Sequence, residues 1–284
     1  MSEVLPSFTI PPIEGSAIAP ILIVIVTGII ALIFEIVKPK SNNVGTSIAS
    51  MIGLGVGGLF AWEQLGYTPS ESLGNMVVVD RFGAVMQLLL ISACALTILF
   101  SESYMREKKI AFGEFYPLVL WSTAGAMMMV TTKNLLMVFI GLEILSIALY
   151  VLAGLSRNEA KSEESAIKYF LLGAFATGFL LYGIALIYGA TGSLHFDDIG
   201  RVWDGRVPQI SGLMLMGLAM ALVGFCFKAG FVPFHQWTPD VYQGAPTNVT
   251  AFMAAASKIA AVATLFRFLD ACAPMHEYWG PVLF

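Results

Sequence analysis

Long apolar runs separated by short polar segments make up most of this chain. A bilayer core of about 30 Å requires about 20 apolar residues for one helical crossing, so runs of that length can be counted directly. Alternating apolar and polar strands of about ten residues, which are typical of membrane barrels, are absent from the sequence. The pattern therefore predicts an all-α polytopic membrane protein with about eight transmembrane helices. The eight runs lie at residues 17–37, 44–62, 81–101, 112–131, 134–155, 165–188, 209–232 and 247–269.

The seventh run is too long for one straight helix. From Ile210 to Gln243 the chain is largely apolar for 34 residues, which as one helix would extend roughly 51 Å at about 1.5 Å per residue. Pro233 removes a backbone donor and clashes with the preceding turn, and Pro239 follows it. We therefore expect a discontinuous seventh helix that breaks just after Lys228. Irregular backbone at membrane depth survives only where protein buries it or where it lines a hydrated cavity.

Composition agrees with a membrane protein and argues against several classes of site. The chain is 57% hydrophobic and 12% charged, whereas a soluble domain usually carries about 25% charged residues. Cys94, Cys226 and Cys272 are far apart and form no CxxC pair, so we expect neither a disulfide framework nor an iron–sulfur site. The opening segment lacks a basic region and a cleavage pattern, so we expect the first helix to be retained.

Lysines and arginines between the runs favour an N-terminus outside a bacterial inner (plasma) membrane. An N-out topology places Lys38, Lys40, Arg106, Lys108, Lys109, Arg157 and Lys161 inside, against Arg81, Lys133, Arg201, Arg206 and Arg267 outside. Three lysines belong to no loop, namely Lys168, Lys228 and Lys258.

Charged residues in the middle of the apolar runs indicate function, because each costs about 2.5–3.5 kcal/mol at a helix centre. Glu143 is the tenth residue of the run 134–155, too far from either end to reach water. Lys258 is the twelfth residue of its run, although its long stem could extend partway to water. Lys228 lies in the last turn before the expected break, where exposed carbonyls favour a cation and burial disfavours it. We predict that Glu143, Lys228 and Lys258 form a proton relay around water.

Two further candidates have ordinary structural explanations. Lys168 lies near the start of its run with Glu164 four residues before it, which is a common pair at a wet helix end. His235, beyond the break, could extend a hydrogen-bonded path or only satisfy freed backbone groups. The same alternatives apply to the other polar residues after the break, which are Gln236, Thr238, Asp240, Tyr242 and Thr247. The sequence GLGVGG at 53–58 matches a dinucleotide fingerprint, but inside an apolar run Gly53 and Gly57 predict close helix packing instead.

Two long stretches, residues 134–196 and 227–268, strongly resemble the antiporter-like subunits of the proton-pumping NADH:quinone oxidoreductase, respiratory complex I. The sequence QWTPDVYQGAPT at 236–247 resembles the subunit N branch, because sister subunits usually carry a leucine, then alanine-histidine and an acid there. By resemblance, Glu143 matches the glutamate of helix five, Lys168 the lysine of helix six, Lys228 the lysine of the discontinuous helix seven, and Lys258 the central lysine of helix eight. The resemblance implies that these lysines pass protons across the membrane.

The same resemblance assigns cofactors and partners. It implies that NADH, FMN, iron–sulfur clusters and quinone are bound by partner subunits, with no cofactor or metal on this chain. The partners it implies are other membrane subunits of complex I, especially a neighbouring antiporter-like subunit and small membrane subunits, within the lipid bilayer and without nucleic acid. The chain is then part of a translocase enzyme but has no redox-active residue of its own.

This chain departs from the family in its length. Family members have about fourteen helices in two inverted repeats of about five, whereas this sequence predicts eight. We therefore expect three leading helices at 1–111, the first repeat at 112–271, the start of a connecting loop at 272–284, and no second repeat. Such a chain is the first half of an inverted-repeat antiporter-like fold, as in a fragment of a longer protein.

Two alternatives to a proton-translocating subunit stay open. A subunit of a multi-component sodium/proton antiporter belongs to the same superfamily, although the sequence after Pro233 argues against it. A non-pumping structural subunit would hold its neighbours together, and its buried charges would have no transport role.

Overall fold

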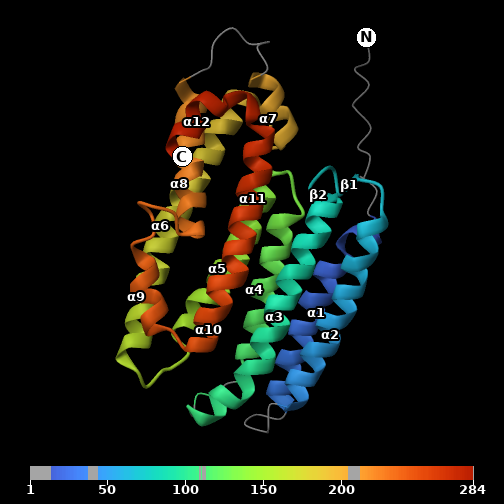
Figure 1. Ribbon diagram of the computed structural model, residues 1–284, viewed down its shortest axis with the longest axis vertical. Helices are drawn as coiled ribbons and strands as arrows, with labels where there is room; N and C mark the ends of the chain where they lie inside the picture. The colour runs from blue at the N-terminus through green and yellow to red at the C-terminus, as the bar shows by residue number, and fades with distance from the viewer. Residues whose placement is uncertain (1–13, 38–43, 109, 111–112, 204–211, 284) are drawn as a thin grey trace, which may run out of the picture.

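The computed structural model describes residues 14–37, 44–108, 110, 113–203 and 212–283. Long helices run roughly along one common direction and form an elongated bundle (Figure 1). The first six α-helices are α1 (Gly15–Val37), α2 (Val44–Glu63), α3 (Arg81–Glu107), α4 (Phe115–Val130), α5 (Leu135–Ala153) and α6 (Ala160–Thr191). They are followed by α7 (Phe196–Trp203), α8 (Gly212–Ala229), α9 (Trp237–Gly244), α10 (Thr247–Phe252), α11 (Lys258–Ala271) and α12 (His276–Leu283).

Within the described ranges, seven helical segments are long and apolar enough to cross a membrane, and they correspond to seven of the eight expected runs. They are Gly15–Val37, Val44–Gly66, Arg81–Glu107, Leu135–Ala153, Ala160–Thr191, Gly212–Ala229 and Thr247–Ala271. The remaining run contains α4, which has only 16 residues and so spans about 24 Å. Nearly all of α4 is buried among α1, α3 and α5. The prediction of an all-α polytopic membrane protein is confirmed.

A short antiparallel hairpin interrupts the helical pattern between α2 and α3. Strands β1 (Ser70–Ser72) and β2 (Val77–Val79) pair with Ser70 opposite Val79. Leu73, Gly74 and Asn75 all have positive φ, which makes the tight turn between the strands. The sequence analysis did not predict this hairpin because both strands have only three residues. We call the end of the bundle that carries it the hairpin end.

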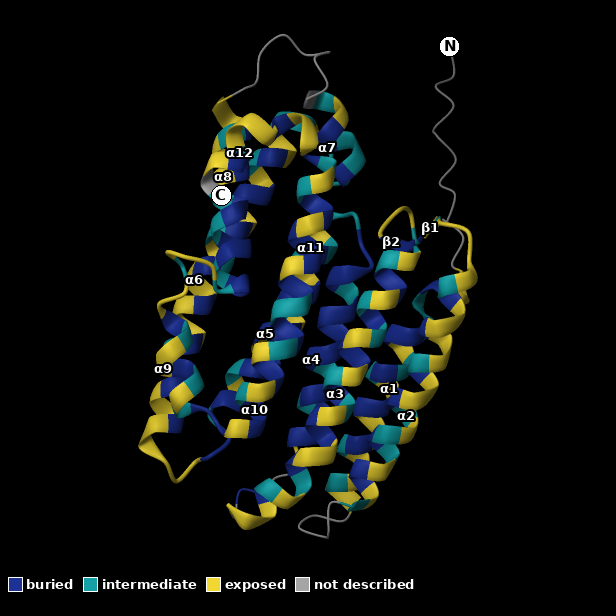
Figure 2. Cartoon of the chain, viewed as in Figure 1, coloured by how far each residue is buried: buried dark blue, intermediate teal, exposed yellow. Residues whose placement is uncertain are grey.

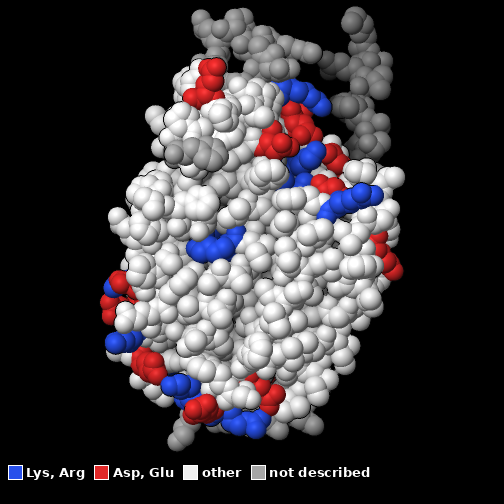
Figure 3. Space-filling view, viewed as in Figure 1, with Lys and Arg blue, Asp and Glu red and all other residues white. Residues whose placement is uncertain are grey.

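Charged side chains collect at the two ends of the bundle, with a broad uncharged band between them (Figure 3). A basic patch interrupts this band near its middle. In the band, exposed residues on the helices are largely apolar, while buried residues face neighbouring helices (Figure 2). Because lipid tails accept apolar surface and reject charge, this distribution fits a bundle that spans a bilayer.

Small residues bring pairs of helices into close contact. A Cβ at Gly53 would collide with Thr27 of α1, and one at Gly57 would meet Val24 at 3.4 Å. The predicted packing role of these two α2 glycines is therefore confirmed. On the other side of the bundle, a Cβ at Gly183 of α6 would lie 2.6 Å from the backbone nitrogen of Ala221 in α8. These contacts allow helix backbones to approach closely in lipid.

An ion pair fastens α3 to α11 at the hairpin end. Asp80 caps α3 by accepting a hydrogen bond from the Gly83 N–H at 2.6 Å. Arg267 donates to both Asp80 carboxylate oxygens, at 2.7 and 2.6 Å, and to the Val130 carbonyl at 3.0 Å. Burial raises the pKa of Asp80. The hydrogen bond and charge of Arg267, together with the hydrogen bond from the Gly83 N–H, lower this pKa by a larger amount, so the net shift is downward.

The seventh run breaks where the sequence predicts. Helix α8 ends at Ala229, and Gly230 follows with a φ of 75°. The Phe231 N–H donates to the Cys226 carbonyl at 2.9 Å, which closes the end of the helix. The chain then turns through residues 230–236 before α9 begins at Trp237. The expected discontinuous helix is confirmed in this part of the chain.

The last run contains a second irregularity. Residues Met253–Ser257 form a π-helical turn between α10 and α11. Lys258 is the first residue after this turn. Single π-turns inside α-helices are rare. Those that do occur are often located at functional sites. After α11, the stretch expected to begin a connecting loop contains the short helix α12.

Candidate functional site

The candidate site is centred on Lys228, which is 3% exposed in the last turn of α8. Its Nζ donates to the Ser146 hydroxyl of α5 at 2.7 Å and to the Tyr169 hydroxyl of α6 at 3.1 Å. Both partners are neutral and fully buried. A buried ammonium is costly unless it is hydrogen-bonded and compensated, so these two hydroxyls stabilise the charged form directly.

Lys258, at the start of α11, approaches the C-terminal end of α8 where Lys228 lies. Its Nζ donates to the backbone carbonyl of Lys228 at 3.2 Å. The exposed carbonyls at a helix C-terminus carry partial negative charge, so the ammonium of Lys258 stabilises the end of α8. A Cβ at Gly230 would lie only 2.8 Å from this Nζ. Glycine therefore provides both the positive φ of the break and the space that Lys258 occupies.

Aromatic rings enclose the two lysines. The Lys258 Nζ lies 4.6 Å from the centre of the Trp237 ring and 6.0 Å from that of Tyr242, within range of cation–π attraction. Trp237 stacks on Tyr169 with a centroid distance of 4.8 Å, and its indole N–H donates to the Phe227 carbonyl at 3.0 Å. The break thus brings α9 back against α6 and α8, with Trp237 packed between Tyr169 and Phe227. Lys228 is buried there, while Lys258 stays partly exposed.

Buried hydroxyl groups continue the polar surroundings beyond the lysines. The hydroxyls of Thr238 and Tyr242 are buried and have no hydrogen-bond partner among the described residues. A cavity of about 10 Å³ beside Lys228 is lined by Ser146, Tyr150 and Thr177 among other residues. A cavity of about this size is at the lower limit for one water molecule. The Thr238 and Tyr242 hydroxyls on one side of the break, and the polar groups that line the cavity on the other, can therefore bind water.

Glu143, the expected acidic member, lies one turn before Ser146 on α5 and is partly exposed. It makes no hydrogen bond or ion pair within the described part of the chain, but it lies close enough to Lys228 for coulombic attraction. Its neighbours on α5, Ile140, Ile144 and Ile147, are exposed apolar residues. Thus α5, α8 and α11 do converge as predicted, but a serine on α5 rather than Glu143 contacts the lysine.

Lys168 lies apart from this centre. Its Nζ forms ion pairs with Glu164 at 2.7 Å and with Asp240 of α9 at 2.6 Å. The Glu164 pair is the one that the spacing in the sequence suggests. These residues line a groove of about 180 Å³ between α6 and α9, together with Lys161, Ser165, Gln243 and Gly244. Lys168 therefore stands at an opening beside the site, next in sequence to Tyr169.

The other polar residues after the break are dispersed. His235 and Gln236 are exposed, and the structure does not bring His235 to either central lysine. Thr247 accepts a hydrogen bond from the Tyr104 hydroxyl of α3 at 3.3 Å, well away in the fold. Of the residues suggested as path members, Thr238 and Tyr242 are the two that lie near Lys258.

Sequence reasoning did not identify Ser146, Tyr169 or Trp237 as partners of the lysines. Ser146 is three residues after Glu143, so the two share one side of α5. Tyr169 directly follows Lys168, and only the charged residue of the two was considered from the sequence. The π-turn before Lys258 had no signal, because its sequence MAAAS is compatible with an ordinary helix.

Comparisons with known proteins identify the family. Residues 132–284 match the family described as "NADH:quinone oxidoreductase/Mrp antiporter, TM". The chain is 41% identical over 276 residues to NADH-quinone oxidoreductase subunit N of Trichlorobacter lovleyi, covering 95% of this chain and 56% of that protein. It is 45% identical over 220 residues to subunit N of Magnetococcus marinus, covering 77% of this chain and 45% of that protein. The chain thus spans about half the length of the curated relatives that it matches.

Solved structures show the same fold. A chain of respiratory complex I from Thermus thermophilus with bound Aureothin matches with a TM-score of 0.74 and 36% identity, covering 87% of this chain and 52% of that chain. A chain of the membrane-bound sulfane sulfur reductase, an archaeal respiratory membrane complex, matches with a TM-score of 0.75. It is only 23% identical and covers 92% of this chain and 55% of that chain, so it supports the fold alone.

Proposed function

Because this chain belongs to the NADH:quinone oxidoreductase/Mrp antiporter transmembrane family, we propose that it is part of a proton-translocating membrane subunit of an NADH:quinone oxidoreductase. The observation that carries the proposal is Lys228, a buried ammonium whose hydrogen-bond partners are the neutral hydroxyls of Ser146 and Tyr169. A charge without a buried counterion is a poor structural element, but it is suited to gaining and losing a proton.

The geometry supports a relay between two lysines on either side of one broken helix. Lys228 Nζ lies on the α5–α6 side, while Lys258 binds the Lys228 carbonyl from the α9–α11 side. Because like charges repel strongly in a low dielectric, a proton on one lysine disfavours a proton on the other. A backbone carbonyl does not relay protons, so transfer between the lysines requires hydroxyls or water. Thr238 and Tyr242 supply such groups beside Lys258.

Glu143 is placed to control this balance. The Glu143 carboxylate attracts the Lys228 ammonium at longer range, and the Lys258 ammonium repels the Lys228 ammonium. Because Glu143 is partly exposed on an apolar face, a change in its surroundings would alter the charge that Lys228 experiences. We propose that Glu143 acts in this way, and that Lys168 lies at a polar opening rather than in the central pair. His235 remains a candidate only for the exposed end of a path.

Sodium transport, which the Mrp antiporter part of the family description suggests, fits the site less well. A sodium ion requires several oxygen ligands, whereas two lysines occupy this centre and would repel it. Replacing sodium with choline is therefore expected to leave transport unchanged. Transport that required sodium would favour an antiporter subunit instead.

Redox chemistry and partners follow from the same proposal. We infer that NADH, FMN, the iron–sulfur clusters and quinone belong to other subunits, and that other membrane subunits of complex I contact this one. We also propose that residues 112–271 act as one repeat that a second repeat completes. The bundle is then a multi-pass component of the bacterial inner membrane with its N-terminus outside.

The test is substitution of Lys228 by alanine in the assembled enzyme. Without the ammonium at the centre, proton pumping by inverted membrane vesicles given NADH is expected to fall at least about tenfold, which corresponds to about 1.4 kcal/mol. Quinone reduction and subunit assembly are measured in the same membranes. Lys108→Ala, which removes an exposed lysine at the end of α3, is the matched control and is expected to pump normally. Unchanged pumping in Lys228→Ala, with the variant assembled, would show a structural subunit.

A further inference from the structure

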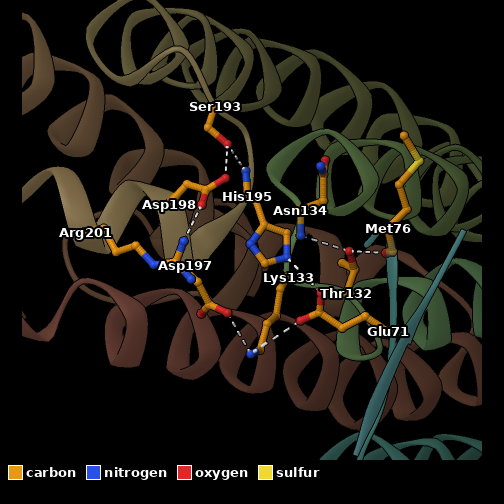
Figure 4. A network of polar contacts seen from close by, with 10 residues as sticks. All are labelled: Glu71, Met76, Thr132, Lys133, Asn134, Ser193, His195, Asp197, Asp198 and Arg201. Carbon is orange, nitrogen blue, oxygen red and sulfur yellow. Dashed lines mark hydrogen bonds and ion pairs between the residues drawn. The ribbon is translucent and has the colours of Figure 1, made fainter. Parts of the chain in front are cut away.

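A second polar cluster lies at the hairpin end of the bundle, where three separate segments meet (Figure 4). Glu71 comes from β1, His195 from the link between α6 and α7, and Asp197 from the first turn of α7. One ligand atom from each of the three side chains lies within 4.8 Å of the other two. None of these residues takes part in the lysine site.

The backbone that carries the imidazole is held firmly. The His195 N–H donates to the Ser193 hydroxyl at 3.1 Å, and the Phe196 N–H donates to the Lys133 carbonyl at 2.8 Å. Asn134 and His195 also form an isolated antiparallel bridge. The α6–α7 link is therefore fixed against the α4–α5 link, and the position of the imidazole does not depend on a free loop.

The imidazole points at a carboxylate without forming a hydrogen bond to it. His195 Nε2 lies 3.6 Å from Glu71 Oε2, and the side chain is only 14% exposed. This nitrogen is buried and lacks a hydrogen-bond partner among the described residues. A buried polar atom without a partner is uncommon and calls for an explanation, such as an ion that belongs there.

A lysine lies on the other side of the same carboxylates. Lys133 Nζ is 3.1 Å from Asp197 Oδ2 and 3.9 Å from Glu71 Oε1 (Figure 4). One ammonium against two carboxylates leaves a negative charge uncompensated. The Lys133 side chain is partly exposed, so its flexible stem can turn toward solvent if another cation takes its place.

We propose that Glu71, His195 and Asp197 bind a divalent transition-metal ion, with Zn²⁺ as the best match, in competition with the Lys133 ammonium. Imidazole nitrogen and carboxylate oxygens bind Zn²⁺ at about 2.0–2.2 Å, which in a tetrahedral site puts neighbouring ligand atoms about 3.3 Å apart. The ligand atoms, which lie within 4.8 Å of one another, need to approach by at most about 1.5 Å to reach this geometry. Three protein ligands leave the fourth position for water. The imidazole disfavours Mg²⁺ and Ca²⁺, which prefer oxygen ligands alone.

Equilibrium dialysis of the protein, purified in its native membrane assembly, against buffered Zn²⁺ tests this site. The ion bound per protein is counted by mass spectrometry in four forms. His195→Gln is expected to bind one Zn²⁺ fewer, because its affinity for the ion falls at least about 100-fold. Loss of a group that only supports a metal ligand already lowers metal affinity by about 10–100-fold. Lys133→Met is expected to bind the ion about tenfold more tightly, because a competing charge is removed. His276→Gln, a histidine outside the cluster, is expected to match the parent protein.

A second measurement uses the parent protein alone. X-ray absorption at the zinc edge of the parent protein, loaded with one equivalent of Zn²⁺, is expected to show one imidazole with oxygen ligands and no sulfur. Equal zinc stoichiometry in the parent protein and in His195→Gln would overturn the proposal. Weaker or unchanged binding in Lys133→Met would also overturn it, because the lysine would then not compete with the ion.

Discussion

At the scale of single residues, the candidate site depends on neutral partners for a buried cation. Ser146 and Tyr169 come from two helices and both reach Lys228 Nζ. Their hydroxyls can accept from the ammonium and can donate to the amine, so they serve both protonation states. A carboxylate in direct contact would instead hold the charged form. The choice of hydroxyl partners therefore keeps the energies of the two states closer together.

Substitution of Tyr169 by phenylalanine isolates one of these contacts. A hydrogen bond to a charged group contributes about 1.5–3 kcal/mol, so its loss is expected to reduce proton pumping by about tenfold or more. Tyr182→Phe is the matched control, since Tyr182 lies on the same helix and is largely exposed. Pumping assays on membrane vesicles with equal amounts of each variant make the comparison. Equal rates for both variants would remove Tyr169 from the mechanism.

Asp80→Asn tests the ion pair between α3 and α11. The pKa of Asp80 is lowered by Arg267 in the folded protein, so the pair stabilises the fold above the unfolded pKa of about 3.9 and loses this contribution as the pH falls below it. The variant leaves the buried Arg267 without its partner, which is expected to cost about 3–5 kcal/mol at neutral pH.

Thermal unfolding in lipid nanodiscs, measured from about pH 8 down to about pH 3 and so through the unfolded pKa of about 3.9, tests this effect. The gap between the parent protein and Asp80→Asn is expected to narrow toward the acid end. Asp198→Asn is the control, because its ion pair with Arg201 is exposed and such pairs contribute at most about 1 kcal/mol. A gap that did not change with pH would contradict the assignment.

At the scale of elements, close helix contacts fix the positions of helices, whereas helix irregularities free backbone groups for other contacts. Helices α6 and α8 approach closely at Gly183 and Gly217, which fixes their relative position. The break after α8 instead frees the Phe227 and Lys228 carbonyls, which accept hydrogen bonds from Trp237 and Lys258. Rigid pairing on one side thus holds an irregular site on the other, which agrees with the rule that such backbone must be enclosed by protein.

Gly183→Ala is expected to disturb the α6–α8 contact. Its Cβ would lie 2.6 Å from the Ala221 nitrogen and 2.7 Å from the Gly217 carbonyl, and overpacking of this kind costs about 1–3 kcal/mol. Gly178→Ala on the same helix meets nothing within 4 Å and is expected to be neutral or stabilising by up to about 1 kcal/mol. Melting temperatures of the two variants give the comparison. A Gly183→Ala variant as stable as Gly178→Ala would contradict the close approach.

At the scale of the whole molecule, charge and exposure define two ends and an apolar belt (Figures 2 and 3). The β1–β2 hairpin, α7 and α12 lie at the hairpin end, and the α5–α6 link lies at the opposite end (Figure 1). The α5–α6 link, which carries Arg157, and α7, which carries Arg201, therefore lie at opposite ends (Figure 1), as their assignment to opposite sides of the membrane requires. The belt between them matches the requirement that charges avoid the lipid.

Labelling from the two sides of the membrane tests the proposed orientation. Met76→Cys at the hairpin and Asn158→Cys in the α5–α6 link both introduce exposed thiols, while Cys94, Cys226 and Cys272 are buried. An impermeant maleimide added to intact spheroplasts is expected to label Met76→Cys and to leave Asn158→Cys unlabelled. Inverted vesicles are expected to give the opposite result. The reverse pattern in both preparations would place the N-terminus inside.

The sequence by itself determined the class of fold, the helix crossings, the break after Lys228 and the two lysines at the centre. These features depend on local properties: the length of apolar runs, the missing donor of Pro233, and the high energy of a charge in lipid. Only the tertiary structure decided that Ser146 rather than Glu143 contacts Lys228, that Lys258 binds the end of α8, and that Lys168 pairs outside the centre. Those contacts join helices far apart in the sequence, and their geometry depends on how the helices pack, which residue spacing along one helix does not specify.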